Sequence, residues 1–219
     1  MPQSALIIGG GDGGSAEELL EHNTIQSVEL VEIDQAVIDF SRSYLRGINH
    51  GVMDVKGGDP RLEILVADGL QYMQNSLAMY DLMIFDLTDP GGPSQPLYTA
   101  AFYKHCAARL KPGGLLSLQV ASPFAQAERV LSTLSDMARA FSVVRPYMVS
   151  IPLSGGQWMT AFASQSMDPA TLAIAQADAV IRNRSLTSLQ HYNGHTHQAA
   201  MALPNFVREL VKPTGALWK

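Results

Sequence analysis

The stretch LIIGGGDGGSAEELLEH, residues 6–22, decides the fold, because an apolar strand runs through a glycine-rich turn into a helical pattern. Five glycines and Asp12 fill the six positions from Gly9 to Gly14. Ser15 followed by Glu18 predicts a capping box at the start of the helix. A turn of this kind usually holds a phosphate or a nucleoside. Asp12 repels a phosphate, so the sequence indicates a ligand that tolerates a carboxylate.

Strands and helices alternate outward from this stretch. After the first strand at residues 5–9 and the first helix at 15–22, apolar runs predict strands at 28–33, 62–67, 80–87 and 114–121, and helical periods occupy 35–44, 98–110 and 125–141. Near-continuous apolar strands of this kind are typical of a parallel sheet covered by helices on both faces. Residues 143–151 and 157–164 then predict an antiparallel hairpin. We therefore expect an α/β protein with a methyltransferase-type Rossmann fold, whose mostly parallel seven-stranded sheet is closed by an antiparallel C-terminal hairpin.

The connections and the tail complete this picture. Asp34 is placed to cap the second helix. The sequence KPGG at 111–114 predicts the end of one helix and the turn into the fifth strand. Residues 165–219 predict a helix, a histidine-containing loop and a last helix at 204–211. We expect this helical segment to belong to one domain spanning residues 1–219.

Composition excludes several classes of protein. With 219 residues, 47% of them hydrophobic, and a formal net charge of −5, the chain is typical of a globular protein that does not bind nucleic acid. No run of 18 apolar residues predicts a membrane span, and a strand that begins by Ala5 leaves no room for a signal peptide. The single cysteine, Cys106, is expected to be a buried hydrophobe, and the cytoplasm is the expected compartment. No metal site is predicted, because His191, His195 and His197 have no carboxylate or cysteine near them in the sequence.

Acidic residues follow four consecutive predicted strands. Because ligands of an open parallel sheet bind beyond the carboxyl ends of its strands, these acids should meet at one rim; they are Asp12, Glu32 with Asp34, Asp68, and Asp86 with Asp89. An acid after the second strand is placed to accept both ribose hydroxyls, and one after the third is placed to accept the amine of an adenine. The alternatives stay open: Glu32 as a surface acid, Asp34 and Asp68 as helix caps, and Asp86 and Asp89 as turn residues.

These acids favour one kind of ligand. A nucleoside fits the first three strands, while Asp12 disfavours both a phosphate and the carboxylate of an amino-acid tail. A nucleoside whose tail carries an ammonium but no carboxylate suits the rim. Each charged hydrogen bond there would contribute about 1.5–3 kcal/mol.

At this point the sequence resembles the polyamine aminopropyltransferases, the spermidine synthase family. LIIGGGDGG, VEID, ADGLQYM, FDLTDPGGPSQPLYTAAFY and LKPGGLLSLQ are similar to successive blocks of that family. The hairpin YMVSIP…SGGQWMTAFAS and the segment HYNGHTHQAAMALPNFVREL are similar to its C-terminal part. The resemblance covers nearly the whole chain.

The resemblance implies an activity. The family transfers the aminopropyl group of decarboxylated S-adenosylmethionine to an amine such as putrescine, giving spermidine and methylthioadenosine. The nucleoside is thus a co-substrate, and no permanently bound cofactor is implied. Small-molecule amines and nucleosides are the implied partners, and a homodimer is the family expectation.

The resemblance also assigns roles to residues. Asp86 would accept a proton from the attacking amine. The amine-binding residues would be Asp12, Asp89, Gln119 and Trp158. The nucleoside-binding residues would be Gly9, Gly10, Gly11, Glu32, Ile33, Asp68, Gly69 and Pro93.

The sequence departs from the family in three ways. This sequence starts almost at the glycine strand, so it does not include the family's usual N-terminal β-rich domain or the amine-pocket tyrosine that this domain supplies. After Ile-Pro in the hairpin, where the family has tyrosines, this chain has Leu153 and Ser154. Two other functions therefore stay open: a methyltransferase that uses intact S-adenosylmethionine, and a nucleoside-binding relative without catalysis.

Overall fold

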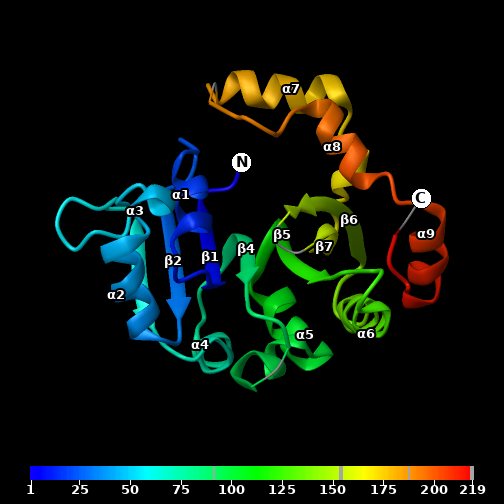
Figure 1. The fold of residues 1–219 in the computed structure, drawn as a ribbon, viewed down its shortest axis with the longest axis horizontal. Helices are drawn as coiled ribbons and strands as arrows, with labels where there is room; N and C mark the ends of the chain where they lie inside the picture. The colour runs from blue at the N-terminus through cyan, green and yellow to red at the C-terminus, as the bar shows by residue number, and fades with distance from the viewer. Residues whose placement is uncertain (91, 153–154, 187, 218–219) are drawn as a thin grey trace.

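The computed structural model describes residues 1–90, 92–152, 155–186 and 188–217, and within them seven strands form one sheet in the order β3-β2-β1-β4-β5-β7-β6 (Figure 1). The strands from β3 to β5 are parallel, β7 is antiparallel to β5, and β6 is antiparallel to β7. Their bounds are Ser4–Gly9 (β1), Ser27–Glu32 (β2), Leu62–Val66 (β3), Tyr80–Asp86 (β4), Leu110–Ala121 (β5), Val143–Ile151 (β6) and Gly156–Ser164 (β7). The predicted fold class is confirmed.

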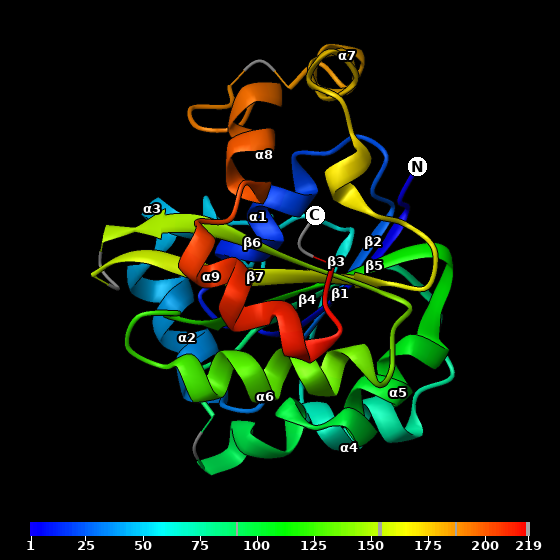
Figure 2. The ribbon, with the colours of Figure 1, turned by 90° about the vertical axis from the view of Figure 1, so that its right-hand side faces the viewer.

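Helices cover both faces of this sheet (Figure 2). On one face lie α4 (Gly69–Asn75), α5 (Ala100–Arg109) and α6 (Ala127–Ala138). On the other lies α1 (Gly14–Leu20), beside α2 (Gln35–Tyr44) and the short α3 (Arg46–Asn49). The central strand β1 packs against both layers: Leu6 and Ile8 belong to the core on the α5 side, and Ile7 belongs to the core on the α1 side. This two-sided burial explains why its sequence is apolar without alternation.

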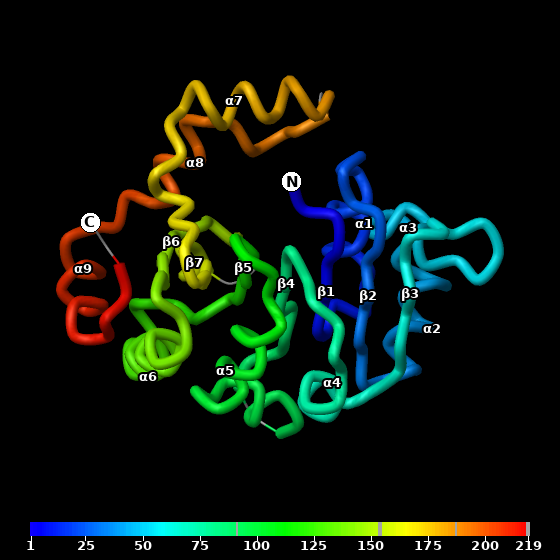
Figure 3. The backbone as a smooth tube through the Cα atoms, turned by 180° about the vertical axis from the view of Figure 1, so that it is seen from behind, coloured from blue at the N-terminus to red at the C-terminus, as the bar shows by residue number. Residues whose placement is uncertain are grey.

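The C-terminal segment lies along the β6–β7 end of the sheet. It contains α7 (Ile174–Asn183), α8 (Gly194–Met201) and α9 (Asn205–Val211). Helix α8 packs against β6 and α9 against α6. Figures 1 and 3 show α7 on the opposite side of the sheet from α5 and α6. No helix in the described ranges is both long and apolar enough to cross a membrane.

Three local predictions were wrong. Helix α1 is capped at Gly13, which adopts a left-handed φ of 81°, and no side chain caps it, so Ser15 and Glu18 form no capping box. Strand β5 begins at Leu110, directly after α5, and residues 111–114 lie inside it at a register shift opposite β4. The predicted histidine loop contains α8, because the Asn193 side chain accepts hydrogen bonds from the N–H groups of His195 and Thr196.

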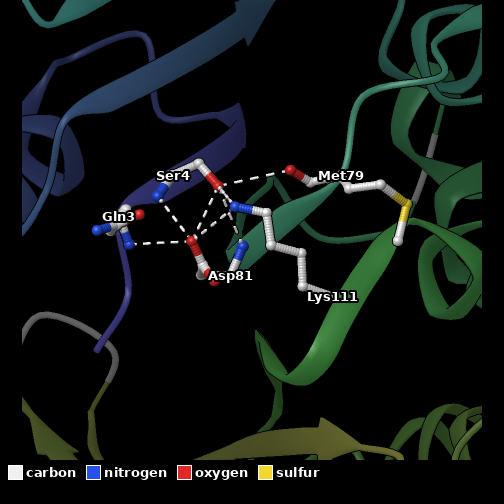
Figure 4. A network of polar contacts seen from close by, with 5 residues as sticks. All are labelled: Gln3, Ser4, Met79, Asp81 and Lys111. Carbon is white, nitrogen blue, oxygen red and sulfur yellow. Dashed lines mark hydrogen bonds and ion pairs between the residues drawn. The ribbon is translucent and has the colours of Figure 1, made fainter.

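A polar network joins three strands at their amino ends (Figure 4). Oδ2 of Asp81 accepts hydrogen bonds from the backbone N–H groups of Gln3 and Ser4, both at 2.9 Å, and from the ammonium of Lys111 at 3.0 Å. Burial alone would raise the pKa of Asp81, but the Gln3 N–H, the Lys111 ammonium and Ser4 outweigh it and lower the pKa to about 2. This network ties together the amino ends of these strands, at the end of the sheet opposite the acidic rim.

Candidate active site

A cavity of about 180 Å³ opens at the carboxyl ends of the parallel strands. It includes seven of the predicted site residues, from four consecutive strand ends and the segment after β4: Gly9, Glu32, Ile33, Asp68, Gly69, Asp86 and Pro93. The other lining residues are mainly apolar and include Ile8, Val31, Leu87 and Leu97. An apolar slot rimmed by hydrogen-bond acceptors suits a nucleoside better than a phosphate.

The glycine-rich turn lets β1 approach β4 closely. Gly9 has a φ of 80°, and a Cβ atom there would overlap the carbonyl oxygen of Asp86. The N–H of Gly10 donates to that same carbonyl oxygen at 2.9 Å. Gly10 and Gly11 do not line the cavity themselves, but a Cβ on Gly11 would lie 2.9 Å from the carboxylate of Glu32. These glycines are therefore needed to position the acids at the rim.

Asp86 is the last residue of β4 and lines the cavity. Its Oδ2 accepts a hydrogen bond from the Ser15 hydroxyl at 2.7 Å. Burial raises the pKa of Asp86, the Ser15 hydrogen bond opposes that rise, and the negative charge of Asp12 adds to it. The two carboxylates of Asp12 and Asp86 therefore repel each other across the turn, as expected of a site that awaits a cation.

Asp12 is held by the turn that contains it. Its Oδ1 accepts from the N–H of Gly14 at 3.0 Å, and its carbonyl oxygen accepts from the Asn49 amide at 3.1 Å. Asp12 does not line the cavity. Its negative charge nevertheless acts on Asp86, which does line the cavity.

The acids after β2 and β3 have structural roles as well as places at the rim. Asp34 caps α2 through the N–H of Ala36 at 2.8 Å, as predicted. Asp68 caps α4 through the N–H groups of Leu70 and Gln71, and it also lines the cavity. Glu32 accepts from the N–H of Asp34 at 3.0 Å and lines the cavity too. A helix cap and a rim position thus coexist at Asp68.

Asp89 is not among the residues that line the cavity, and it pairs with a residue that sequence reasoning missed. Its Oδ1 lies 2.8 Å from Nη1 of Arg129, which projects from α6. The Arg129 hydrogen bond lowers the pKa of Asp89. Nothing in the sequence near Arg129 singled it out, because it lies 40 positions from Asp89 on an ordinary amphipathic helix.

The remaining predicted amine-binding residues, Gln119 and Trp158, do not line this cavity. The Gln119 amide donates to the carbonyl oxygen of Leu87 at 2.5 Å. Trp158 lines a separate cavity of about 500 Å³ with Phe124 and Gln126, and its buried indole N–H has no hydrogen-bond partner among the described residues. Leu153 and Ser154 lie outside the described residues.

His197 and Cys106, whose side chains could in principle carry chemistry, are both buried among other residues. His197 is buried, with Nδ1 at 2.9 Å from the Tyr192 hydroxyl and Nε2 at 2.9 Å from the carbonyl oxygen of Pro169. Cys106 is buried in α5, as predicted, and burial raises the pKa of its thiol far above neutrality. Neither side chain is placed to take part in chemistry at the rim.

Comparison with known proteins gives a consistent match. A family model described as the spermine/spermidine synthase domain matches residues 1–173. The polyamine aminopropyltransferase of Nitrosomonas europaea is 41% identical over 210 residues, covering 96% of this chain and 63% of that protein. Polyamine aminopropyltransferase 2 of Hyperthermus butylicus is 33% identical over 215 residues, covering 97% of this chain and 69% of that protein.

Solved structures agree with the sequence matches. A spermidine synthase in complex with the transition-state analogue AdoDATO superposes with a TM-score of 0.87 and 33% identity, over 97% of this chain and 70% of that one. The spermidine synthase from Thermotoga maritima superposes with a TM-score of 0.85, over 97% and 69%. The chain thus spans 63–70% of the length of these four proteins.

Proposed function

The chain belongs to the spermine/spermidine synthase family, and we propose that it is a polyamine aminopropyltransferase. Its donor would be decarboxylated S-adenosylmethionine, with putrescine as the acceptor and spermidine and methylthioadenosine as products. The observation that carries this proposal is the place of Asp86. This carboxylate lines the nucleoside-sized cavity and is also close enough to Asp12 for its pKa to be raised by that charge.

The nucleoside would occupy the cavity between β1, β2 and β4. Glu32 would accept the ribose hydroxyls, and Asp68 with Gly69 would lie at the adenine, as their positions in the cavity wall support. Pro93 and Leu97 would provide the apolar wall over the rings. The donor's aminopropyl tail carries an ammonium and no carboxylate, so Asp12 would attract it rather than repel it.

The transfer itself needs a free amine lone pair. An alkyl ammonium of this kind has a pKa near about 10.4, so the attacking nitrogen must first lose a proton, and Asp86 would accept it. The lone pair then attacks the methylene carbon bonded to the sulfonium. The new C–N bond forms as the C–S bond breaks, and its electron pair goes to sulfur to give neutral methylthioadenosine. Alignment of nitrogen, carbon and sulfur would contribute most of the acceleration.

Mass spectrometry of the products tests the proposal directly. Purified protein is incubated with decarboxylated S-adenosylmethionine and a panel of diamines and triamines, and in parallel with intact S-adenosylmethionine. Spermidine and methylthioadenosine are the expected products. A methylated product from the intact donor would indicate a methyltransferase, and tight methylthioadenosine binding without turnover of any amine would indicate a non-catalytic relative.

Asp86→Asn is the decisive variant. Because asparagine keeps the shape of the side chain but accepts no proton, we expect kcat to fall by about 10²–10⁴-fold. Binding of methylthioadenosine, measured by calorimetry, should change little. Retention of near-full activity by this variant would refute the role of Asp86 as the base.

A further inference from the structure

Arg129 places a guanidinium on one of the two acids that follow β4. Nη1 of Arg129 lies 2.8 Å from Oδ1 of Asp89, and the amide of Gln126, the residue just before α6, lies 3.4 Å from Oδ2. The Arg129 side chain is only 13% exposed, whereas that of Asp89 is 61% exposed. The cation is therefore held by the protein, while the carboxylate remains open to solvent and to a ligand.

The ring of Tyr98 packs against the guanidinium of Arg129 and fixes its position. The guanidinium carbon lies 5.3 Å from the centroid of the Tyr98 ring, in a cation–π contact. The hydroxyl of buried Tyr98 donates to the carbonyl oxygen of Thr88 at 3.0 Å. Nε and Nη2 of Arg129 are buried and have no hydrogen-bond partner within the described part of the chain. The ion pair with Asp89 and the contact with Tyr98 thus hold the guanidinium in place.

We propose that Arg129 is a specificity-determining residue that acts as a built-in competitor for the far ammonium of a diamine acceptor at Asp89. The proposal rests on the proposed function. An incoming ammonium has to share or displace a counterion that is already in place, so Asp89 attracts it less than a free carboxylate would. The protein should therefore discriminate only weakly between a diamine and a monoamine of equal length.

Arg129 acts on acceptor binding and not on proton transfer. The charge on Asp86 is governed by its own burial, by Ser15 and by Asp12, and Arg129 is not among the groups that perturb it. Removal of the guanidinium should therefore change the KM for acceptors that reach Asp89. It should leave kcat and the pH dependence of kcat unchanged.

The experiment compares two substitutions with two acceptors. Arg129→Met removes the charge and keeps the apolar length of the side chain, and Arg129→Lys keeps a cation. KM and kcat are measured with putrescine and with butylamine, which has the same four carbons and one amine. In Arg129→Met we expect the KM for putrescine to fall about three- to tenfold, whereas the KM for butylamine and kcat for both acceptors stay within about twofold. Arg129→Lys should keep the wild-type KM for putrescine.

The outcomes separate this proposal from the proposed function. An unchanged or raised KM for putrescine in Arg129→Met, or equal changes for both amines, would overturn the role of Arg129. Absence of turnover by the wild type with any amine would instead refute the transferase. In that case, calorimetric titration of putrescine into protein saturated with methylthioadenosine still compares Arg129→Met with the wild type, and unchanged affinity would overturn the proposal. Circular dichroism checks that each variant folds. If Arg129→Met does not fold, Arg129→Gln takes its place in the same measurements.

Discussion

At the scale of single residues, the charge on Asp86 is governed by three effects of known sign. Burial raises its pKa, the Ser15 hydroxyl lowers it, and the charge of Asp12 raises it. Asp86 must be ionised to accept a proton, so its activity should be lost on the acid side as pH falls through this raised pKa. The acid limb of the kcat/KM profile, which reports the free enzyme, should therefore lie above the ordinary aspartate value of about 3.9.

Two substitutions should move this acid limb in opposite directions. Ser15→Ala removes the hydrogen bond that favours the carboxylate, so the pKa of Asp86 rises further and the limb moves to higher pH. Asp12→Asn removes the neighbouring charge, so the pKa falls and the limb moves to lower pH. The midpoint of the limb in a series of kcat/KM values against pH is the measurement, and Arg129→Met serves as the control that should not move it. Movement of both variants in the same direction would contradict the electrostatic account of this site.

The acids of the site were predictable from the sequence and their partners were not. Glu32, Asp68 and Asp86 were found because a parallel sheet brings the ends of its strands to one rim, where all three line the cavity. The pairing with Arg129 depends on how α6 is rotated against the sheet, which neither spacing nor composition reveals. The sequence also did not indicate that Trp158 would line a separate cavity.

At the scale of elements, the turn between β1 and α1 carries the site, and Gly9 is its tightest point. A side chain at Gly9 would be strained by the φ of 80° and would overlap the backbone of Asp86, which cannot move without shifting β4. We expect Gly9→Ala to abolish methylthioadenosine binding and to lower stability by more than about 1–3 kcal/mol. Calorimetry and thermal unfolding measure the two effects.

Gly47→Ala is the matched control for this prediction. Gly47 lies in α3, and nothing lies within 4 Å of a Cβ placed there. Alanine in a helix is more favourable than glycine by about 0.5–1 kcal/mol, so this variant should be as stable as the wild type or more so. Equal behaviour of Gly9→Ala and Gly47→Ala would show that the turn does not require glycine.

The strands could be predicted more reliably than their ends. Runs such as residues 80–87 are buried from both faces, so their apolar character is unambiguous. The ends depend on single backbone conformations: the left-handed Gly13 takes the capping position that Ser15 was expected to fill, and Ser15 turns instead to Asp86. The four-residue α3 was missed because so short a helix carries too few periodic positions, and α4 was indicated only by Asp68 as a possible helix cap.

At the scale of the whole molecule, the amino ends and the carboxyl ends of the strands differ in how their carboxylates are surrounded. The amino ends of β1, β4 and β5 are joined by the satisfied network around Asp81, where every oxygen–nitrogen contact stabilises the carboxylate. The carboxyl ends carry Asp86 with its raised pKa and the repulsion from Asp12, both of which favour a bound cation over the empty site. The carboxylate at the amino ends of the strands is thus fully satisfied and the one at the carboxyl ends is not, as expected of a fold whose ligands bind beyond the carboxyl ends of its strands.

The ion pair between Arg145 and Asp168 tests whether the C-terminal segment folds with the sheet. Arg145 lies in β6 with a side chain only 6% exposed, and its Nε and Nη2 bond both carboxylate oxygens of Asp168, at 2.9 and 2.5 Å. Asp168→Asn removes the negative charge from this buried ion pair, at a cost of about 3 kcal/mol. If residues 165–219 belong to one domain with the sheet, unfolding should remain a single transition whose midpoint falls by about 6–12 °C.

Differential scanning calorimetry distinguishes this outcome from separate unfolding of residues 165–219. The pH dependence of the free energy of unfolding gives a second check. Arg145 lowers the pKa of Asp168, so the stabilisation is present above the unfolded-state value of about 3.9 and is lost as pH falls through the folded-state pKa. The difference between wild type and Asp168→Asn should therefore shrink below about pH 4. The exposed pair of Arg139 and Asp136 supplies the control, because Asp136→Asn should change stability by less than about 1 kcal/mol. Two resolved transitions in Asp168→Asn, with the first confined to the C-terminal helices, would contradict the single domain.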